Sequence, residues 1–176
     1  MLTLRAEKNS PLTWTELDEN FQNTLRTDAF LVFGYEKPVN STINLTNGTD
    51  VLIPINFLET TNIAATLGTN AVTIPAGEYF AFGALYLERA GWFIYKLTAG
   101  LTALCKSMET RGYPTDSAGH SVCVTLPSLL LSKFTVQEQT VIQAKAVIQN
   151  AGSLGISINI VQDTTRPFQV VLFKTK

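Results

Sequence analysis

The chain has 176 residues, enough for one domain of ordinary size and a small appendage. Hydrophobic residues make up 45% of it and charged residues only 15%, well below the roughly 25% typical of soluble domains. The net charge of -1 and the lack of a basic block argue against nucleic-acid binding. No apolar run approaches about 20 residues, so no membrane span is expected, and the apolar surplus predicts burial against other copies of the chain.

The N-terminus and the cysteines give further expectations. Polar residues interrupt the opening MLTLRAEKNSPLTWTEL before an apolar signal-peptide core could form, so we expect assembly in a cytoplasm. Cys105 and Cys123 stand in no CxxC pair and beside no histidine with metal-ligand spacing. Two buried thiols are favoured over a disulfide or a metal site, and no cofactor is expected.

The first predicted element is a short helix. A Ser-Pro pair followed by the capping box Thr13-x-x-Glu16 is a helix-start signal. Apolar side chains then recur at helical spacing, at Trp14, Leu17, Phe21 and Leu25. A helix of about three turns is marginal alone and must dock this stripe. It could pack on its own domain, but we favour packing against other copies or a neighbouring protein.

After Asp28 the sequence becomes a series of short runs rich in Val, Ile, Phe, Tyr and Thr, separated by Gly, Asn and Pro. This texture is typical of an all-β antiparallel sandwich, so we divide the chain into a helical segment at 1–28 and a β head domain at 29–176. Ala64–Asn70 and Lys106–Gly119 are predicted loops. Eight or nine strands are expected within Phe30–Tyr35, Thr42–Leu45, Val51–Phe57, Ala71–Ile74, Tyr79–Glu88, Gly91–Leu97, Leu101–Lys106, Ser121–Leu126, Thr140–Gln149, Gly155–Val161 and Phe168–Lys174.

The predicted strand from Tyr79 to Leu87 is apolar on both faces. One face carries Phe80, Phe82, Ala84 and Tyr86, and the other carries Tyr79, Ala81, Gly83, Leu85 and Leu87. Since an exposed strand normally alternates with polar residues, one face should meet the opposite sheet and the other a second subunit. The candidate subunit-interface residues are Tyr79, Leu85, Tyr86 and Leu87. In contrast, the segment at 141–148 alternates Ile142, Ala144, Ala146 and Ile148 with Gln143 and Lys145, which predicts a half-exposed strand.

The segment Ser10-Pro11-Leu12-Thr13-Trp14-Thr15-Glu16-Leu17-Asp18-Glu19-Asn20-Phe21, preceded by Leu4-Arg5, resembles the start of many bacteriophage tail-fibre and related virion proteins. A Ser-Pro-Leu-Thr, aromatic, Glu-Leu-Asp-x-Asn-Phe string is common there. The resemblance implies a virion location and a helix that anchors the chain to the particle through Trp14, Leu17 and Phe21. Such fibres usually continue into a long shaft, whereas this chain passes directly into a β domain.

The rest of the chain is similar to the jelly roll of the tumour necrosis factor and complement globular-head families. Val72–Phe82 resembles their Gly-x-Tyr-x-Phe strand, and Pro167–Phe173 resembles their closing strand. The resemblance implies a sandwich that associates as a compact homotrimer through aromatic and aliphatic residues. The family's usual Gly-Asp before the penultimate strands is replaced here by Gln137-Glu138-Gln139.

No enzymatic chemistry is expected. His120 is the sole histidine, and although Asp116 and Ser121 stand near it, no Gly-x-Ser-x-Gly elbow accompanies them. The carboxylates Glu16, Asp18 and Glu19 are explained by helix capping. Because aromatic and charged loop residues often serve binding, the predicted long loop holds a candidate contact with a host receptor or host surface carbohydrate. Its residues are Arg111, Tyr113, Asp116 and His120.

Together these patterns predict a homotrimeric structural protein of a phage virion. The favoured hypothesis is a short tail fibre, head fibre or receptor-binding tip that contacts other virion proteins of the tail, baseplate or capsid. The alternative is a capsid decoration (cement) protein, in which the same trimer stabilises the shell at threefold positions. A depolymerase acting on host glycans is disfavoured.

Overall fold

The computed structural model describes residues 29–38, 44–45, 48–88, 90–111, 126–150, 158–160 and 166–175. The predicted helix, and with it the division at residue 28, lies outside these ranges and stays a prediction. Within them, the regular elements are all β-strands. They are β1 (Phe30–Tyr35), β2 (Asn44–Leu45), β3 (Gly48–Ile53), β4 (Phe57–Thr61), β5 (Thr66–Gly68), β6 (Ala71–Ile74), β7 (Gly77–Glu88), β8 (Ala90–Ala99), β9 (Thr102–Lys106), β10 (Thr110–Arg111), β11 (Leu126–Val136), β12 (Thr140–Asn150), β13 (Ile158–Ile160) and β14 (Phe168–Lys174).

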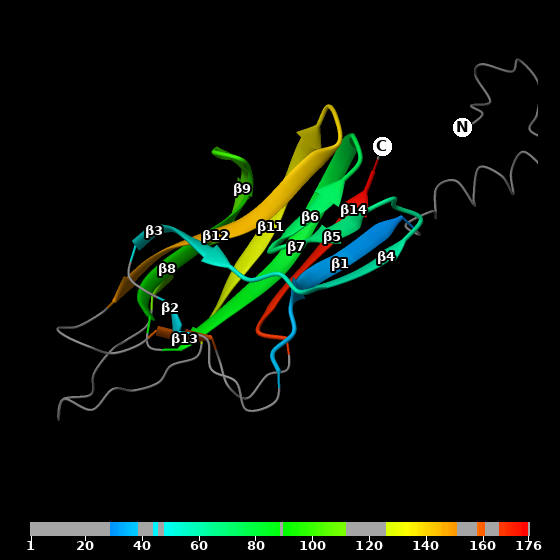
Figure 1. Cartoon of the computed structure of the whole chain (residues 1–176). Helices are drawn as coiled ribbons and strands as arrows, with labels where there is room; N and C mark the ends of the chain where they lie inside the picture. Colours follow the sequence, from blue (N-terminus) through cyan, green and yellow to red (C-terminus); the bar gives the residue numbers. More distant parts are fainter. Residues whose placement is uncertain are drawn as a thin grey trace, which may run out of the picture.

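The strands form two antiparallel sheets that pack face to face (Figure 1). Sheet A contains the run β4-β1-β14-β7-β11, and sheet B contains the run β5-β6-β12-β8-β9. Strands near the N-terminal end of the chain pair with strands near the C-terminal end, and each further pair comes from nearer the middle of the sequence. The pairs are β1 with β14, β6 with β12, β7 with β11, and β8 with β9. This is the pattern of a long hairpin rolled into two sheets, which is a jelly roll. The predicted all-β antiparallel fold is confirmed.

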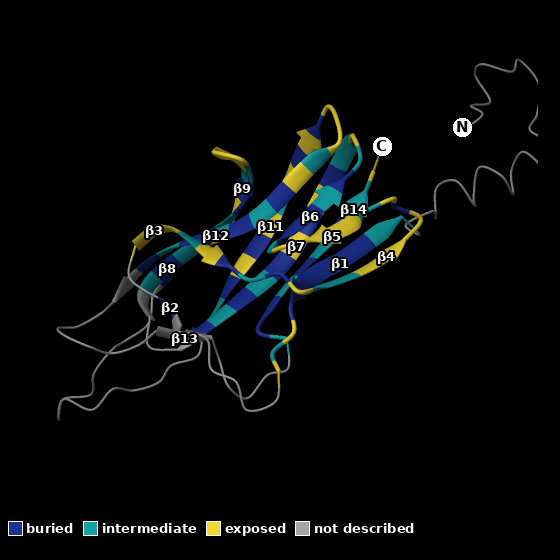
Figure 2. Cartoon of the chain, in the orientation of Figure 1, coloured by how far each residue is buried: buried dark blue, intermediate teal, exposed yellow. Residues whose placement is uncertain are grey.

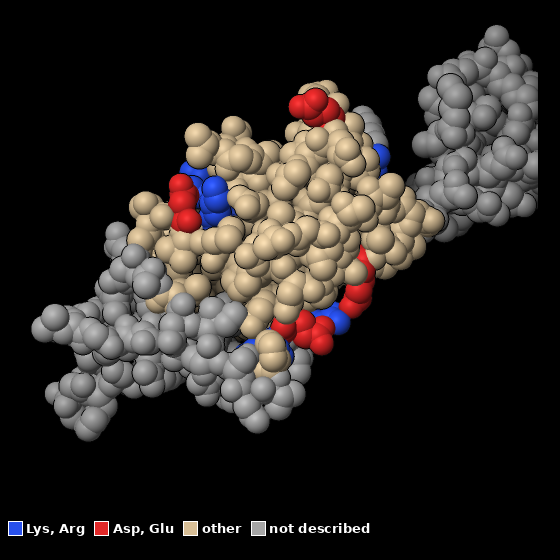
Figure 3. All heavy atoms as spheres, in the orientation of Figure 1, with Lys and Arg blue, Asp and Glu red and all other residues tan. Residues whose placement is uncertain are grey.

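The core lies between the sheets and follows the period of two along each strand. In β12, Ile142, Ala144, Ala146 and Ile148 are at most 1% exposed, as the sequence alternation predicts. Figure 2 shows the same alternation along β7 and β11, with buried segments separated by partly or fully exposed ones. On the face shown in Figure 3 the described residues are mostly uncharged, as expected from the low charge content.

Four segments differ from the sequence prediction. The expected strand Val51–Phe57 is two strands, because the chain leaves sheet B after β3 and enters sheet A at β4. Ile53 and Ile55 are buried as expected, but Phe57 lies on the outer side of sheet A, in register with Gly34. The segments predicted as loops contain the short strands β5 and β10.

Strand β11 is the largest difference, since the sequence pattern predicts no strand beyond Leu126. Its run LPSLLLSKFTV opens with a proline and breaks the alternation with three successive leucines. Even so, β11 pairs with β7 from Leu126 opposite Leu87 to Val136 opposite Gly77. It is an edge strand of sheet A, where Pro127 is tolerated because one side of the strand needs no ladder donor.

Hydrogen bonds join the two sheets beside β11. Tyr95 N–H of β8 donates to Ser107 Oγ (2.9 Å), and Ser107 N–H donates to the Tyr95 carbonyl (2.8 Å). On the other side, Met108 N–H donates to the Leu129 carbonyl (2.7 Å), and Ser128 Oγ donates to the Met108 carbonyl (2.6 Å). The segment after β9 therefore links sheet B to sheet A and holds β11 in place.

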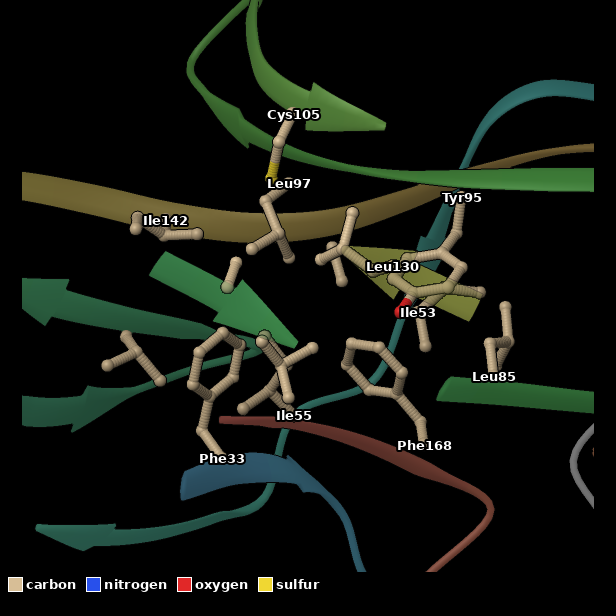
Figure 4. Close-up of a cluster of buried hydrophobic side chains, with 14 of the residues drawn as sticks. Phe33, Ile53, Ile55, Leu85, Tyr95, Leu97, Cys105, Leu130, Ile142 and Phe168 are labelled. Carbon is tan, nitrogen blue, oxygen red and sulfur yellow. The ribbon is translucent and has the colours of Figure 1, made fainter. Parts of the chain in front are cut away.

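Tyr95 occupies the centre of the core. Its ring points from β8 toward Phe168 of β14 (Figure 4), edge-to-face at a centroid distance of 5.6 Å. Gly83 leaves room for the Tyr95 hydroxyl, because a Cβ there would lie 3.0 Å from that oxygen and 2.8 Å from the Gln169 carbonyl oxygen. The hydroxyl is buried and has no hydrogen-bond partner among the described residues. Burial raises the pKa of Tyr95 far above its ordinary value, so the phenol stays neutral.

We predict that Tyr95→Phe raises the free energy of unfolding by about 1 kcal/mol, because a buried hydroxyl without a partner costs about 1–3 kcal/mol of desolvation. Urea denaturation measures the change. Gly83→Ala tests the same spot in the opposite direction and should lower stability by about 1–3 kcal/mol through overpacking. A less stable Tyr95→Phe variant would show that the hydroxyl is hydrogen-bonded after all.

Candidate functional site

The outer side of sheet A carries a nearly continuous apolar surface. The pairing register aligns its outward side chains across β11, β7, β14 and β1. One row reads Lys133, Phe80, Phe173 and Phe30, and the next reads Leu131, Phe82, Val171 and Val32. We call this surface the apolar face and define it by Phe30, Val32, Phe80, Phe82, Ala84, Leu129, Leu131, Val171 and Phe173.

Large side chains of the apolar face remain open to water in the single chain. Phe82 is 50% exposed and Leu131 is 62% exposed, while Phe80 and Leu129 are each near two-fifths exposed. The Phe30 and Phe173 rings lie 6.4 Å apart and extend the surface across β14 to β1. Contiguous exposed apolar surface of this kind marks interaction sites on soluble proteins.

A hollow of about 330 Å³ opens at one end of the apolar face. Phe82, Ala84 and Val171 give it apolar walls, and Tyr86, Gln169 and Arg166 supply its polar groups. Aromatic walls with a few polar groups at the margin are the usual composition of a contact that anchors a partner's side chain.

Arg166 limits the apolar face on the side of β4. Its guanidinium contacts the carboxylates of Glu59 (2.8 Å) and Glu36 (3.2 Å) and lies 4.4 Å from the centre of the Phe57 ring. The hydrogen bond with Glu59 is the main cause that raises the pKa of Arg166. Two carboxylates neutralise the cation, so Arg166 forms a polar border to the apolar face and no strong anion site.

The structure corrects most of the predicted subunit-interface residues. Tyr79 and Leu85 are 0% exposed and Leu87 is 1% exposed, because all three point toward sheet B. The Tyr79 ring stacks on Phe134 at 5.7 Å, and its hydroxyl donates to the Pro75 carbonyl (2.8 Å). These three residues therefore belong to the core of the chain itself. Tyr86 alone points outward and borders the hollow.

The other residues of the apolar face were missed as site residues, although a signal for some was present in the sequence. Phe80, Phe82 and Tyr86 lie on the same side of β7 because they are separated by even numbers of residues. Assigning this whole side to the interface, and the side of Tyr79 to the core, identifies Phe80 and Phe82 as site residues. Leu129 and Leu131 had no such signal, since their strand was not predicted. Val171 and Phe173 join the face only through the pairing of β14 with β7.

Several predicted residues cannot be compared with the structure. Trp14, Leu17 and Phe21 of the anchoring helix and Tyr113, Asp116 and His120 of the candidate receptor loop lie outside the described residues. Arg111 ends β10, where its backbone pairs with Trp92. These assignments stay predictions.

Cysteine and metal chemistry give no competing site in the described part of the chain. Cys105 is a free thiol, and burial raises its pKa to about 11. This agrees with the predicted buried thiol, while Cys123 lies outside the described residues. No group of three or more metal-ligating side chains is found in the described ranges. In the same ranges no helix has the length and apolar character needed to cross a membrane.

We predict opposite outcomes for lysine at two adjacent positions. Leu85→Lys buries a charge without a partner and should cost more than about 3 kcal/mol, so the protein should unfold or precipitate. Tyr86→Lys places its charge on the outer side of sheet A and should leave the fold intact. Soluble yield and thermal unfolding followed by circular dichroism compare the two. Equal damage by both would mean that Tyr86 is also part of the core.

No protein-family model matches the sequence, and no curated protein matches it. Among solved structures, the crystal structure of murine APRIL at pH 8.0 is similar with a TM-score of 0.48 at 9% sequence identity, covering 83% of this chain and 98% of that chain.

Proposed function

We propose that the chain is a non-enzymatic structural protein of a bacteriophage particle, a homotrimer with a jelly-roll head and an N-terminal anchoring helix. It acts as a short tail fibre, head fibre or receptor-binding tip. The observation that supports association between copies is the apolar face, on which Phe80, Phe82, Leu129 and Leu131 are 38–62% exposed in the single chain. Aromatic residues are enriched at the buried centres of protein interfaces.

The position of the exposed apolar residues supports a contact between copies. Phe82 and Leu131 face outward side by side on paired strands, and Met108, which is 65% exposed, is hydrogen-bonded to Leu129 at the sheet edge. Apolar surface is therefore available both on the face of sheet A and around the β11 edge. A closed ring of three copies needs two different surface patches that meet head to tail, whereas a twofold dimer needs a single patch that contacts its own copy. Two apolar regions on one chain are therefore compatible with a ring.

The number three and the particle come from the two resemblances. The similarity of the head to tumour necrosis factor and complement globular heads implies threefold association. The string Ser10–Phe21 implies attachment to a virion through the helix. The capsid decoration protein remains the alternative, because the same trimer could stand on threefold positions of the shell. The two roles differ in the partner that the helix binds.

For the oligomer, we expect light scattering of the full chain at micromolar concentration to give three times the chain mass of 19.3 kDa. Leu131→Lys should dissociate the trimer, because it brings a charge into the interface without a partner. Val141→Lys is the matched control, since Val141 is also exposed (53%) but belongs to sheet B. A monomeric mass for the full chain would contradict the proposal, as would dissociation by the control variant.

For the particle, we expect purified phage to contain the protein and to lose it with Phe21→Ser. Burying one such side chain contributes about 1.5–3 kcal/mol, and three copies multiply the loss through avidity. Thr13→Ala removes only a helix cap, worth about 1 kcal/mol, and should weaken incorporation without abolishing it. Copies per particle are counted by quantitative blotting. Labelling the particles with an antibody against the protein then shows whether it is located on the tail or on the capsid. Normal incorporation of the Phe21→Ser variant would show that the anchor lies elsewhere in the chain.

A further inference from the structure

Three lysines from strands β8, β9 and β12 form one row on the outer side of sheet B. Lys96 of β8 lies opposite Lys106 of β9 on one side and opposite Lys145 of β12 on the other. Neighbouring strands are about 4.8 Å apart, so the row extends over about 10 Å of backbone. We call Lys106, Lys96 and Lys145 the lysine row.

The row keeps a positive charge despite its local partners. Like charges directly opposite each other destabilise a sheet. The ammonium groups of Lys96 and Lys145 reduce this repulsion by contacting different partners. Lys96 pairs with the carboxylate of Asp50, whereas Lys145 Nζ donates to the Gly100 carbonyl (3.2 Å). Three ammonium groups against the one carboxylate of Asp50 give this group a net charge of about +2.

Asp50 is closely coupled to the lysine row. Its backbone has a φ of 59°, a left-handed conformation that Asp and Asn adopt more readily than most residues. The hydrogen bond with Lys96 is the main cause that lowers the pKa of Asp50, and the charge of Lys145 acts in the same direction. Asp50 therefore sits within the field of at least two lysines and screens them.

Along β8 and β12 the row is bounded by uncharged residues. Next to it along β8 and β12 lie Thr98 opposite Gln143 on one side and Ile94 opposite Val147 on the other. Figure 3 shows Lys or Arg and Asp or Glu atoms gathered in the region of β3 and β9, surrounded by uncharged surface. The charge is thus concentrated in one short line.

We propose that the lysine row binds an acidic polysaccharide, whose carboxylate or sulfate groups repeat along a chain. Gln143 offers an amide to sugar hydroxyls beside the charged line. Single-stranded nucleic acid fits less well, because no aromatic side chain lies directly beside the row and Trp92, on the same side of β8, is four residues from Lys96. An anionic membrane surface usually requires clusters of four to eight basic residues. The proposal does not depend on the trimer, because the row lies on the opposite sheet from the apolar face.

The test measures binding of the full-length protein to polygalacturonate (carboxylated) and heparin (sulfated) by titration calorimetry at low salt. Lys106→Ala and Lys145→Ala should each weaken binding up to about fivefold, and the double variant about tenfold. Lys133→Ala is the matched control, since it removes the same charge from sheet A, where Lys133 pairs with Glu78 (2.8 Å). It should bind like the wild type.

Asp50→Asn gives a test in the opposite direction. Asn tolerates the left-handed backbone at this position, and loss of the carboxylate should strengthen polysaccharide binding about two- to fivefold. Circular dichroism verifies that each variant is folded.

Whichever of polygalacturonate and heparin binds more tightly identifies the recognised group as a carboxylate or a sulfate. The proposal is overturned if neither polysaccharide binds, if Lys133→Ala weakens binding as much as the row variants, or if Asp50→Asn leaves binding unchanged. Tighter binding to a single-stranded oligonucleotide or to phosphatidylglycerol vesicles would overturn the class of partner.

Discussion

The packing of β7 against sheet B is the constraint on which the rest of this structure depends. β7 is the long central strand of sheet A, paired with β14 on one side and β11 on the other. Both of its faces are apolar, and only one can pack on sheet B. Tyr79, Leu85 and Leu87 fill the core, and the opposite set, including Phe80 and Phe82, is left outside. The apolar face therefore follows directly from which side of β7 packs against sheet B.

The two outer sides of the sandwich differ in chemistry because their strands differ in alternation. On the outer side of sheet B, β12 carries Gln143 and Lys145 and β8 carries Lys96, among apolar residues such as Ile94 and Val147. In sheet A, β7, β11 and β14 contribute Phe82, Leu131 and Val171 at matching positions. One side suits contact with other protein, and the other suits solvent and charged ligands. The two proposed contacts, with other copies and with an acidic polysaccharide, therefore fall on different sheets.

The hydrogen bonds around Ser107 and Ser128 connect these two sides. They tie β8 of sheet B to β11 of sheet A through Met108. The buried hydroxyls of Ser107 and Ser128 are hydrogen-bonded to each other. In contrast, the Tyr95 hydroxyl has no hydrogen-bond partner among the described residues. The edge strand β11, which carries Leu129 and Leu131, is thus positioned by polar contacts as well as by its ladder with β7. This fixes the orientation of the most exposed part of the apolar face.

Local alternation in the sequence was sufficient for the class of fold and for much of the core. The buried set Ile142, Ala144, Ala146 and Ile148 could be read directly, since the period of two is a local property. The same local signal failed at β11, where Leu129–Leu131 have no alternation and only pairing with β7 makes a strand. It also failed at Phe57, where the chain changes sheets.

What the sequence determined by itself was the antiparallel β architecture, the alternation of inward and outward residues on regular strands such as β12, and the existence of a strand with two apolar faces. Only the tertiary structure decided which face of β7 is inside, because both faces satisfy the same local pattern. It also brought Lys96, Lys106 and Lys145 into one row. Register between strands distant in the chain depends on the whole fold, and no local pattern in the sequence contains it.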